Sequence, residues 1–252
     1  MSHHLVEAEG LRHVWPDGTV ALDGVTFRIT HGESVGIVGA NGAGKSTLLL
    51  HLCGALVPRE GRVRVGDVPV TKTTLETVRR AVGTVFQDPD DQLFLPTVRD
   101  DVAFGPLNLG LPSEDVETRV KEALDAVDAG PLAPRAPWRL SGGEKRRVAI
   151  ATVLAMKPDV LVLDEPSSGL DPRSRREVIG LLRAFQHTRI VATHDLDLVL
   201  DVCDRTIVLD RGKVAADGPT RQLLADEGLL ARCRLERPLS MKPCPRCGDP
   251  NG

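Results

Sequence analysis

The residues with the clearest chemical potential form a glycine-rich loop, Gly39-Ala-Asn-Gly-Ala-Gly-Lys-Ser46, which fits the pattern G-x-x-x-x-G-K-[ST]. Its glycines allow a tight turn whose backbone N–H groups point inward and, with the start of the following helix, bind phosphate oxygens. Lys45 adds a positive charge, and Ser46 offers a hydroxyl to Mg²⁺. The loop therefore predicts a site for a nucleoside triphosphate with Mg²⁺. The expected phosphate-binding residues are Gly39, Asn41, Gly42, Ala43, Gly44, Lys45, Ser46 and Thr47.

Four further polar residues follow apolar segments that read as strands: Gln87, Asp164, Glu165 and His194. Ligands of parallel sheets bind beyond the carboxyl ends of the strands, so these side chains are expected beside the phosphates. Asp164 suits Mg²⁺, together with Ser46, and Glu165 suits a general base acting on water. Gln87 would orient that water or touch the metal, and His194 would hydrogen-bond the γ-phosphate.

Each of these residues also has an ordinary interpretation. An acidic pair after a strand often marks the start of a helix, and a lone histidine or glutamine in a loop is usually only solvated. Their order after a phosphate loop favours a catalytic site.

A second motif, Leu140-Ser-Gly-Gly-Glu144, contains the S-x-x-E capping box of a helix. A cap does not require paired glycines. Gly142 and Gly143 leave backbone N–H groups uncovered, which favours a second phosphate-binding surface that includes Ser141. This surface is expected too far from Lys45 to serve the same nucleotide, so a second copy of the chain would supply it.

The elements that position these residues follow from hydrophobic periodicity. Residues 5–30 alternate apolar and polar around Pro16-Asp17-Gly18, which predicts antiparallel strands joined by a turn. Apolar residues from Thr97 to Met156 recur at three and four, as in helices. The continuous apolar run 159–163 indicates a buried parallel strand. We therefore expect an α/β domain over 5–225, with a helical insertion at about 90–156 and a tail over 226–252.

The composition excludes several classes of protein. The 252 residues carry a net charge of −3 and only 3% aromatic residues, without tyrosine, which disfavours nucleic acid as a partner. No apolar run approaches the roughly 20 residues of a membrane span, and no signal peptide is apparent, so we expect a cytoplasmic protein. The five cysteines are scattered, unlike a disulfide framework.

With these motifs in this order, the sequence resembles the ATP-binding cassette (ABC) family over about residues 5–225. The resemblance rests on GANGAGKS, Gln87, LSGGE, VLVLDE, SSGLD and His194. It implies a P-loop NTPase (RecA-like) core, an N-terminal antiparallel β subdomain and a helical insertion carrying the signature LSGGE. It also implies two cassettes packed head to tail around two ATP molecules. Each ATP would lie between the phosphate loop of one cassette and Ser141, Gly142 and Gly143 of the other.

The same resemblance assigns Asp171 to the dimer interface and Trp15 to the position of the aromatic residue that stacks on adenine. An ordinary core or surface tryptophan is the alternative for Trp15. The signature ends in Glu144, where Gln is commoner in the family. The second cassette would be either an identical copy or a paralogue.

A narrower similarity lies in Asp88–Phe94 and Thr97–Pro106, which resemble the ATPase subunits of energy-coupling factor importers, most closely the cobalt/nickel branch. By this resemblance, the helix near Gln92–Phe104 receives coupling helices of a transmembrane subunit, which joins a substrate-binding membrane subunit. The chain would then lie at the cytoplasmic face of the membrane. The alternative is that Leu93, Phe94, Val98 and Val102 only close the core. Five acidic residues offer pairing to arginines of the partner, with a solvated face as the alternative for the last two: Asp88, Asp90, Asp91, Asp100 and Asp101.

Two features stay open. Cys244 and Cys247 form a C-x-x-C, either two reduced thiols in a tail or half of a zinc site shared by two tails. His3, His4 and His13 are too few and scattered to indicate a metal site. Rival functions are an ATPase of another ABC importer, for vitamins, amino acids or other small solutes, a cassette ATPase acting on DNA or ribosomes, and a nucleotide-binding module without turnover. The charge and the intact Glu165 and His194 disfavour the last two.

Overall fold

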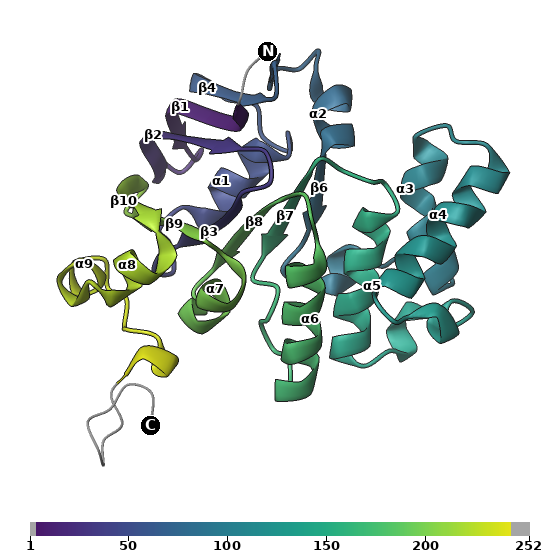
Figure 1. The fold of residues 1–252 in the computed structure, drawn as a ribbon. Helices are drawn as coiled ribbons and strands as arrows, with labels where there is room; N and C mark the ends of the chain where they lie inside the picture. Colours follow the sequence, from purple (N-terminus) through teal and green to yellow (C-terminus); the bar gives the residue numbers. More distant parts are fainter. Residues whose placement is uncertain (1–3, 243–252) are drawn as a thin grey trace.

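A computed structural model describes residues 4–242 of the chain. The strands form two sheets (Figure 1): an antiparallel sheet in the order β2-β1-β4-β5 and a six-stranded sheet in the order β10-β9-β3-β8-β7-β6. The strands are β1 (His4–Val14), β2 (Val20–Thr30), β3 (Ser34–Val38), β4 (Glu60–Val65), β5 (Val68–Pro69), β6 (Val82–Val85), β7 (Val160–Asp164), β8 (Thr188–Thr193), β9 (Arg205–Asp210) and β10 (Lys213–Pro219).

Helices cover both faces of the larger sheet and extend it to one side. The α-helices are α1 (Lys45–Leu52), α2 (Leu75–Ala81), α3 (Val98–Asn108), α4 (Ser113–Ala126), α5 (Gly142–Leu154), α6 (Pro172–Ala184), α7 (Leu196–Val202), α8 (Thr220–Ala225) and α9 (Glu227–Arg232). Short 3₁₀ turns are η1 (Pro89–Asp91), η2 (Gly130–Leu132), η3 (Pro137–Arg139) and η4 (Leu239–Met241).

The larger sheet has a separate hydrophobic core on each face because side chains alternate along a strand. On one face, Val160 and Val162 pack with α1 and the antiparallel sheet. On the other face, Leu161 and Leu163 pack with the helices from α3 onward. Strands β6, β7, β8, β3 and β9 run parallel, so their carboxyl ends share one edge, as expected from the sequence.

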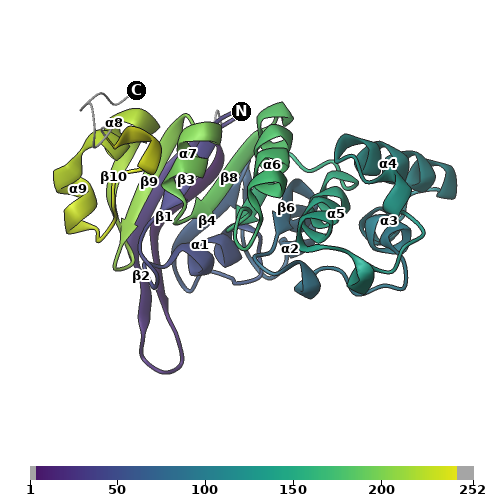
Figure 2. The same cartoon turned by 90° about the horizontal axis from the view of Figure 1, so that it is seen from below.

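The N-terminal hairpin expected from the alternating pattern is confirmed. β1 and β2 pair antiparallel up to Val14 and Val20, and the turn between them closes with a 2.9 Å hydrogen bond from Trp15 N to Thr19 O. The hairpin projects from the body of the molecule in Figure 2. This projection brings Trp15 toward the phosphate loop, where both line one cavity.

The stretch expected to be helical contains α3, α4 and α5, which pack on one another at one end of the molecule (Figure 2). α4 buries one stripe, Val116, Val120, Ala123 and Leu124, and leaves charged residues on its other side. The helical insertion therefore forms a lobe of its own beside β6 and β7. No helix within residues 4–242 combines the length and apolar character needed to span a membrane.

The folded part of the chain continues past the boundary expected near residue 225. Helix α9 places Leu229 and Leu230 in the core at 5% and 1% exposure, and Cys233 follows at 3%. A six-residue helix is too short to show clear periodicity, which is why the sequence suggested a tail here. Strand β10 also escaped prediction, since its polar sequence fits an edge strand that pairs on one side only. Cys244 and Cys247 lie outside the described residues.

Candidate nucleotide site

The glycine-rich loop connects β3 to α1 in the conformation that its sequence predicts. Gly42 and Gly44 have φ angles of +78° and +105°, a region that favours glycine. At Gly44 a side chain would also collide with the carbonyl oxygen of Ala21. The loop therefore needs glycine there both for backbone conformation and for space. It delivers its N–H groups directly into the first turn of α1.

Lys45 occupies the centre of this loop and is only 7% exposed. Its ammonium donates to the carbonyl oxygens of Gly39 at 2.7 Å and Ala40 at 3.4 Å. Burial lowers the pKa of Lys45, while the nearby carboxylates Glu165 and Asp164 raise it. A phosphate placed in the loop would give this buried charge a stronger partner than two neutral carbonyls.

The loop opens into a cavity of about 390 Å³. Its lining contains most residues predicted for the nucleotide, together with Thr19, Val20 and Ala21 of the hairpin, which sequence reasoning missed. The lining is Trp15, Thr19, Val20, Ala21, Asn41, Gly42, Ala43, Gly44, Lys45, Ser46, Thr47, Gln87, Glu165 and His194. The signature residues 141–143 are not part of it. The cavity is thus lined by residues that follow four strand ends, and the signature lies outside it.

Asp164 ends β7 and points an oxygen toward the loop. Its Oδ1 is buried without a hydrogen-bond partner within the described chain, and burial raises the pKa of this carboxyl. The Ser46 hydroxyl and the Lys45 ammonium lower this pKa in opposition to burial. An unsatisfied buried carboxylate oxygen beside a serine hydroxyl fits the oxygen ligands that Mg²⁺ prefers. The donor set therefore suits Mg²⁺ held by Ser46 and Asp164.

Glu165 is held in place by a network of hydrogen bonds. Its carboxylate accepts from the Thr193 hydroxyl at 2.7 Å, from His194 N at 3.1 Å and from His194 Nδ1 at 2.8 Å. Its backbone has a φ of +46°, sparsely populated for a residue with a side chain, and its N–H bonds Ala192 O at 2.8 Å. Strain of this kind gathers at functional sites. The arrangement fixes a 7% exposed carboxylate beside the phosphate loop.

His194 joins the same network from the end of β8. Because its Nδ1 donates to Glu165, its other ring nitrogen, Nε2, is the one available to a ligand. The side chain is 61% exposed, so a phosphate bound in the cavity has access to it. Thr193 was missed by the sequence analysis because a threonine at the end of a strand has many ordinary roles.

Gln87 lies at the cavity in a loop that two unpredicted side chains attach to α5. Arg146, 2% exposed, donates to Phe86 O at 2.8 Å and to Gln87 O at 2.6 Å. Gln92 accepts from Phe86 N and donates to Ala149 O at 2.8 Å. The position of Gln87 is therefore tied to the helix that begins at the signature motif.

Another unpredicted residue, Asp195, connects the loops around the site. Its carboxylate accepts from Ser167 Oγ at 3.0 Å and from Arg175 Nε and Nη2 at 3.1 and 3.2 Å. Its N–H donates to the Thr193 hydroxyl that bonds Glu165. One carboxylate thus joins the segment after Glu165, helix α6 and the segment after His194. The N-terminal position before α7 was the only sequence signal, and it indicated a helix cap.

The signature motif forms the capping box that its sequence predicts. Ser141 N donates to Glu144 Oε2 at 2.8 Å, and Glu144 N donates to Ser141 Oγ at 3.3 Å. A side chain at Gly142 would meet open space, whereas one at Gly143 would collide with Ser174 on α6. Packing within the chain therefore does not require the glycine at 142. At 143, packing between α5 and α6 already requires it.

Asp171, expected at the dimer interface, caps α6 in this structure. Its Oδ1 accepts from Arg173 N at 2.9 Å and Ser174 N at 3.1 Å, and its Oδ2 from Ser174 Oγ at 2.6 Å. The hydrogen bonds from Ser174 lower the pKa of Asp171. Since Ser174 also adjoins Gly143, the cap of α6 and the N-terminus of α5 form one surface of the chain.

Trp15 stands at the rim of the nucleotide cavity and packs edge-on against His13, with ring centroids 4.6 Å apart. His13 Nδ1 lies 3.2 Å from Nε2 of His51, a fully buried residue in the last turn of α1. Burial lowers the pKa of His51 to about 4. The pair of histidines therefore supports Trp15 from behind with uncharged rings.

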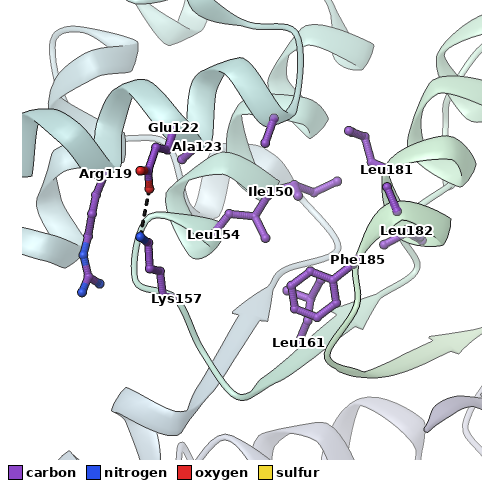
Figure 3. Close-up of a pocket in the computed structure, with 12 residues that line it drawn as sticks. Arg119, Glu122, Ala123, Ile150, Leu154, Lys157, Leu161, Leu181, Leu182 and Phe185 are labelled. Carbon is purple, nitrogen blue, oxygen red and sulfur yellow. Dashed lines mark ion pairs between the residues drawn. The ribbon is translucent and has the colours of Figure 1, made fainter. Parts of the chain in front are cut away.

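A separate apolar cavity of about 260 Å³ lies between α4, α5 and α6 (Figure 3). Figure 3 shows Ile150, Leu154, Leu161, Leu182 and Phe185 around it, with the Glu122–Lys157 ion pair at its rim. It offers no backbone nest for an anion, so it does not suit a triphosphate. It marks the joint between the helical lobe and the core.

Comparison with known proteins agrees with this geometry. A model of the family described as "ABC transporter" matches residues 22–168. A putative ABC transporter ATP-binding protein of Geobacter sulfurreducens is 67% identical, over 98% of this chain and 100% of the relative. The energy-coupling factor transporter ATP-binding protein EcfA of Methanocaldococcus jannaschii is 47% identical, over 93% of this chain and 86% of the relative.

Two solved structures share the fold. The cbiO1 protein of Clostridium perfringens, described as part of the ABC transporter complex cbiONQ, has a TM-score of 0.81 at 38% identity, over 92% of this chain and 94% of that one. The cassette MJ0796, solved as a post-hydrolysis dimer with ADP and Pi, has a TM-score of 0.78 at 29% identity, over 86% of this chain and 99% of that one. The predicted α/β cassette fold, with its antiparallel β subdomain, is thereby confirmed.

Proposed function

The chain belongs to the ABC transporter family of ATPases, and we propose that it is the ATP-hydrolysing subunit of an energy-coupling factor importer for cobalt or nickel ions. The observation that carries the catalytic part is the Glu165 carboxylate, fixed by Thr193 and His194 beside the phosphate loop. Similarity to EcfA and to cbiO1 supports the importer class.

In the proposed reaction, the phosphate loop and Lys45 bind the β- and γ-phosphates of ATP, and Trp15 stacks on adenine. Glu165 accepts a proton from the attacking water as the water oxygen bonds to the γ-phosphorus. The bond between that phosphorus and the β–γ bridging oxygen breaks, and ADP leaves. When both of its ring nitrogens carry a proton, His194 donates through Nε2 to the transferred phosphoryl group while Nδ1 still donates to Glu165, and Gln87 orients the water. Mg²⁺, held by Ser46 and Asp164, would offset charge on the phosphates.

A second cassette completes each site in this proposal. Ser141, Gly142 and Gly143 lie outside the cavity that contains Lys45, and the glycine at 142 leaves space for an anion. The N-terminus of α5 would therefore bind the γ-phosphate of ATP held by the partner. Asp171, at the adjoining cap of α6, would lie at the same interface. The partner is an identical copy or a paralogue.

A groove on the helical lobe supports the proposed membrane partner. The groove, of about 390 Å³, is predominantly apolar, and Phe94 and Phe104 stand in it at 61% and 44% exposure. Their rings contact each other edge-on at 5.2 Å. Leu93, Val98 and Val102 are instead buried in the core, so of the four apolar residues expected near this surface only Phe94 is exposed to a partner. We propose that this groove receives a coupling helix of a transmembrane subunit, which assembles with a substrate-binding membrane subunit at the cytoplasmic face of the membrane.

The acidic cluster contributes less than its sequence suggested. Asp101 is 3% exposed and accepts from Phe94 N and Leu95 N, so it is neither solvated nor available to a partner. Asp90 pairs with Lys145 at 2.6 Å. Asp88 and Asp100 accept hydrogen bonds within their own turns. Within the described chain, Asp91 is the member of this group whose carboxylate has neither a hydrogen bond nor an ion pair, and it lines the groove, where it would meet an arginine of the coupling helix.

Replacing Glu165 by Gln tests the catalytic proposal. Glu165→Gln keeps the shape and most hydrogen bonds but removes the base, so we expect ATP binding to persist, turnover to fall by at least about 100-fold and the ATP-bound dimer to accumulate. Hydrolysis is measured as phosphate release, and dimer formation by sedimentation velocity. Glu76→Gln, an exposed acid on α2, is the matched control. Turnover of Glu165→Gln at the wild-type rate would contradict the assigned base.

Two further experiments separate the importer class from the cargo. Phe94→Ala should reduce co-purification with the transmembrane subunit without slowing hydrolysis by the isolated dimer. Leu239→Ala, which shortens another exposed apolar side chain at a distant place in the chain, should leave co-purification unchanged. ATP-dependent uptake into vesicles carrying the assembled complex then identifies the cargo. Uptake of a vitamin, with no accumulation of Co²⁺ or Ni²⁺, would reject the metal branch and leave the ATPase assignment intact.

A further inference from the structure

One large aromatic side chain close to the signature motif has no role in the site described above. Trp138 lies in the turn η3, three residues before Ser141, and is 68% exposed. The chain contains only two tryptophans, and the other, Trp15, lines the nucleotide cavity. An exposed tryptophan is unusual on the surface of a folded chain and is enriched at the energetic centres of protein interfaces.

The turn holds Trp138 outward. Pro137 and Leu140 on its inner side are buried, and hydrogen bonds from Arg139 N to Ala136 O at 3.0 Å and from Leu140 N to Pro137 O at 3.1 Å close it. Trp138 and Arg139 between them are exposed, as are Ser141 and Gly142. The turn therefore leaves the indole exposed three residues before Ser141, on a segment whose other exposed residues include the signature.

The position places Trp138 within reach of whatever covers the signature. Three residues span at most about 11 Å. An interface of standard size covers about 800 Å² on each partner, equivalent to a disc about 16 Å in radius. Trp138 therefore lies within the radius of an interface centred on Ser141 and Gly142. Arg139, exposed beside it and without an ion pair in the described chain, matches the negative charge of a nucleotide held by that copy.

We propose that Trp138 is an aromatic anchor of the ATP-bound dimer, buried against the second copy at the edge of the nucleotide that lies between them. The proposal rests on the proposed function, because it uses the dimer that the signature implies. Since two backbone hydrogen bonds close η3 and its tryptophan is already exposed, closure requires no rearrangement to expose the anchor. Each nucleotide would then be flanked by Trp15 of one chain and Trp138 of the other.

The two-tryptophan composition gives a direct test. In Trp15→Phe combined with Glu165→Gln, Trp138 is the single fluorophore, and the ATP-bound dimer is retained for measurement. On adding saturating ATP and Mg²⁺, we expect its emission to move to shorter wavelength and quenching by acrylamide to decrease, in step with dimer formation by sedimentation velocity. A dimer whose Trp138 emission and quenching stay those of the monomer would overturn the inference but leave the proposed function standing. If no dimer forms, the result would contradict both the inference about Trp138 and the proposed function.

Affinity measurements provide the second readout. In the Glu165→Gln background, Trp138→Ala should raise the dimer dissociation constant by about 30-fold or more, the effect of removing an interface anchor, with Trp138→Phe intermediate. Leu107→Ala, which shortens another exposed apolar side chain on the helical lobe, should leave the constant unchanged. Binding of ATP to the monomer reports on folding and should be the same in all variants. An unchanged dissociation constant in Trp138→Ala would refute the anchor.

Discussion

The buried histidine His51, which supports Trp15 through His13, makes folding stability depend on pH in a way that follows from its environment. His51 is fully buried, and its pKa is lowered to about 4, first by burial and then by the neighbouring His13. In the unfolded chain it returns to the ordinary value of about 6.5. Between these two values the unfolded chain binds more protons than the folded one, so folding stability falls as pH decreases.

The size of the effect follows from the same two values. For a folded pKa of about 4 and an unfolded pKa of about 6.5, linkage gives a loss of about 2 kcal/mol between pH 8 and pH 5. Screening by solvent at the edge of the cluster reduces this, so we expect about 1–2 kcal/mol. The contribution of the neutral His51 to the free energy of unfolding is fully present above pH 6.5, decreases as pH falls, and is lost completely below about pH 4.

Urea unfolding at pH 8, 6.5 and 5 measures the prediction, with wild type compared with His51→Phe. The phenylalanine keeps a ring of similar size and cannot titrate, so the variant should lose about 1–2 kcal/mol less than wild type between pH 8 and pH 5. His187→Phe, which removes an exposed histidine, controls for the loss of any histidine. If His51→Phe and wild type lose the same free energy over this range, the buried pair does not behave as described.

The remaining predictions concern the loops around the site and the joint between the lobes. Asp195→Asn should lower kcat about tenfold with little change in the KM for ATP, because the substitution weakens the hydrogen bonds that hold the segments around Glu165. Arg173→Ala, on the surface of α6, should change neither constant, and steady-state kinetics measures both variants. Gly143→Ala should lower ATPase activity at least about tenfold, because the new side chain collides with Ser174 of the same chain. Adding Ser174→Gly to that variant should restore part of the activity. A double variant no more active than Gly143→Ala would indicate that Gly143 is needed for contact with phosphate instead. Leu161→Ala, beside the 260 Å³ cavity, should cost about 3–5 kcal/mol of unfolding free energy in urea titration.

The features that the sequence predicts best are those encoded within a few consecutive residues. The turn at Gly42 and Gly44, the capping box at Ser141 and the hairpin beside Trp15 each follow from local chemistry, and the structure has all three. The arrival of Glu165 and His194 at one edge follows from a general property of parallel sheets. These two kinds of signal were sufficient to predict most of the residues that line the nucleotide cavity.

The residues that the sequence did not reveal act over long distances along the chain. Arg146 bonds Gln87 O from 59 residues away, and Gln92 bonds Ala149 O from 57 residues away. In sequence, Arg146 is one of several basic residues on a helix, and nothing nearby shows that it is buried. The burial of Asp101 was unpredicted for the same reason. An acidic residue in the first turn of a helix usually faces solvent, but here its carboxylate accepts hydrogen bonds from two loop N–H groups. Burial of a charged side chain depends on partners that tertiary packing alone brings together.

These long-range contacts also explain how events at the nucleotide would reach a membrane partner. Arg146 on α5 holds the carbonyl oxygens of Phe86 and Gln87, and Gln92 bonds the same helix. Phe86 lines the groove proposed for a coupling helix, while Gln87 lines the nucleotide cavity. α5 itself begins at the signature motif. Helix α5 begins at the signature and is hydrogen-bonded to the segment Phe86–Gln87, which joins the cavity to the groove. A shift of the signature on dimer closure would therefore move the groove with it. The coupling path expected from the proposed function is therefore a short chain of hydrogen bonds through the buried Arg146 and the half-buried Gln92.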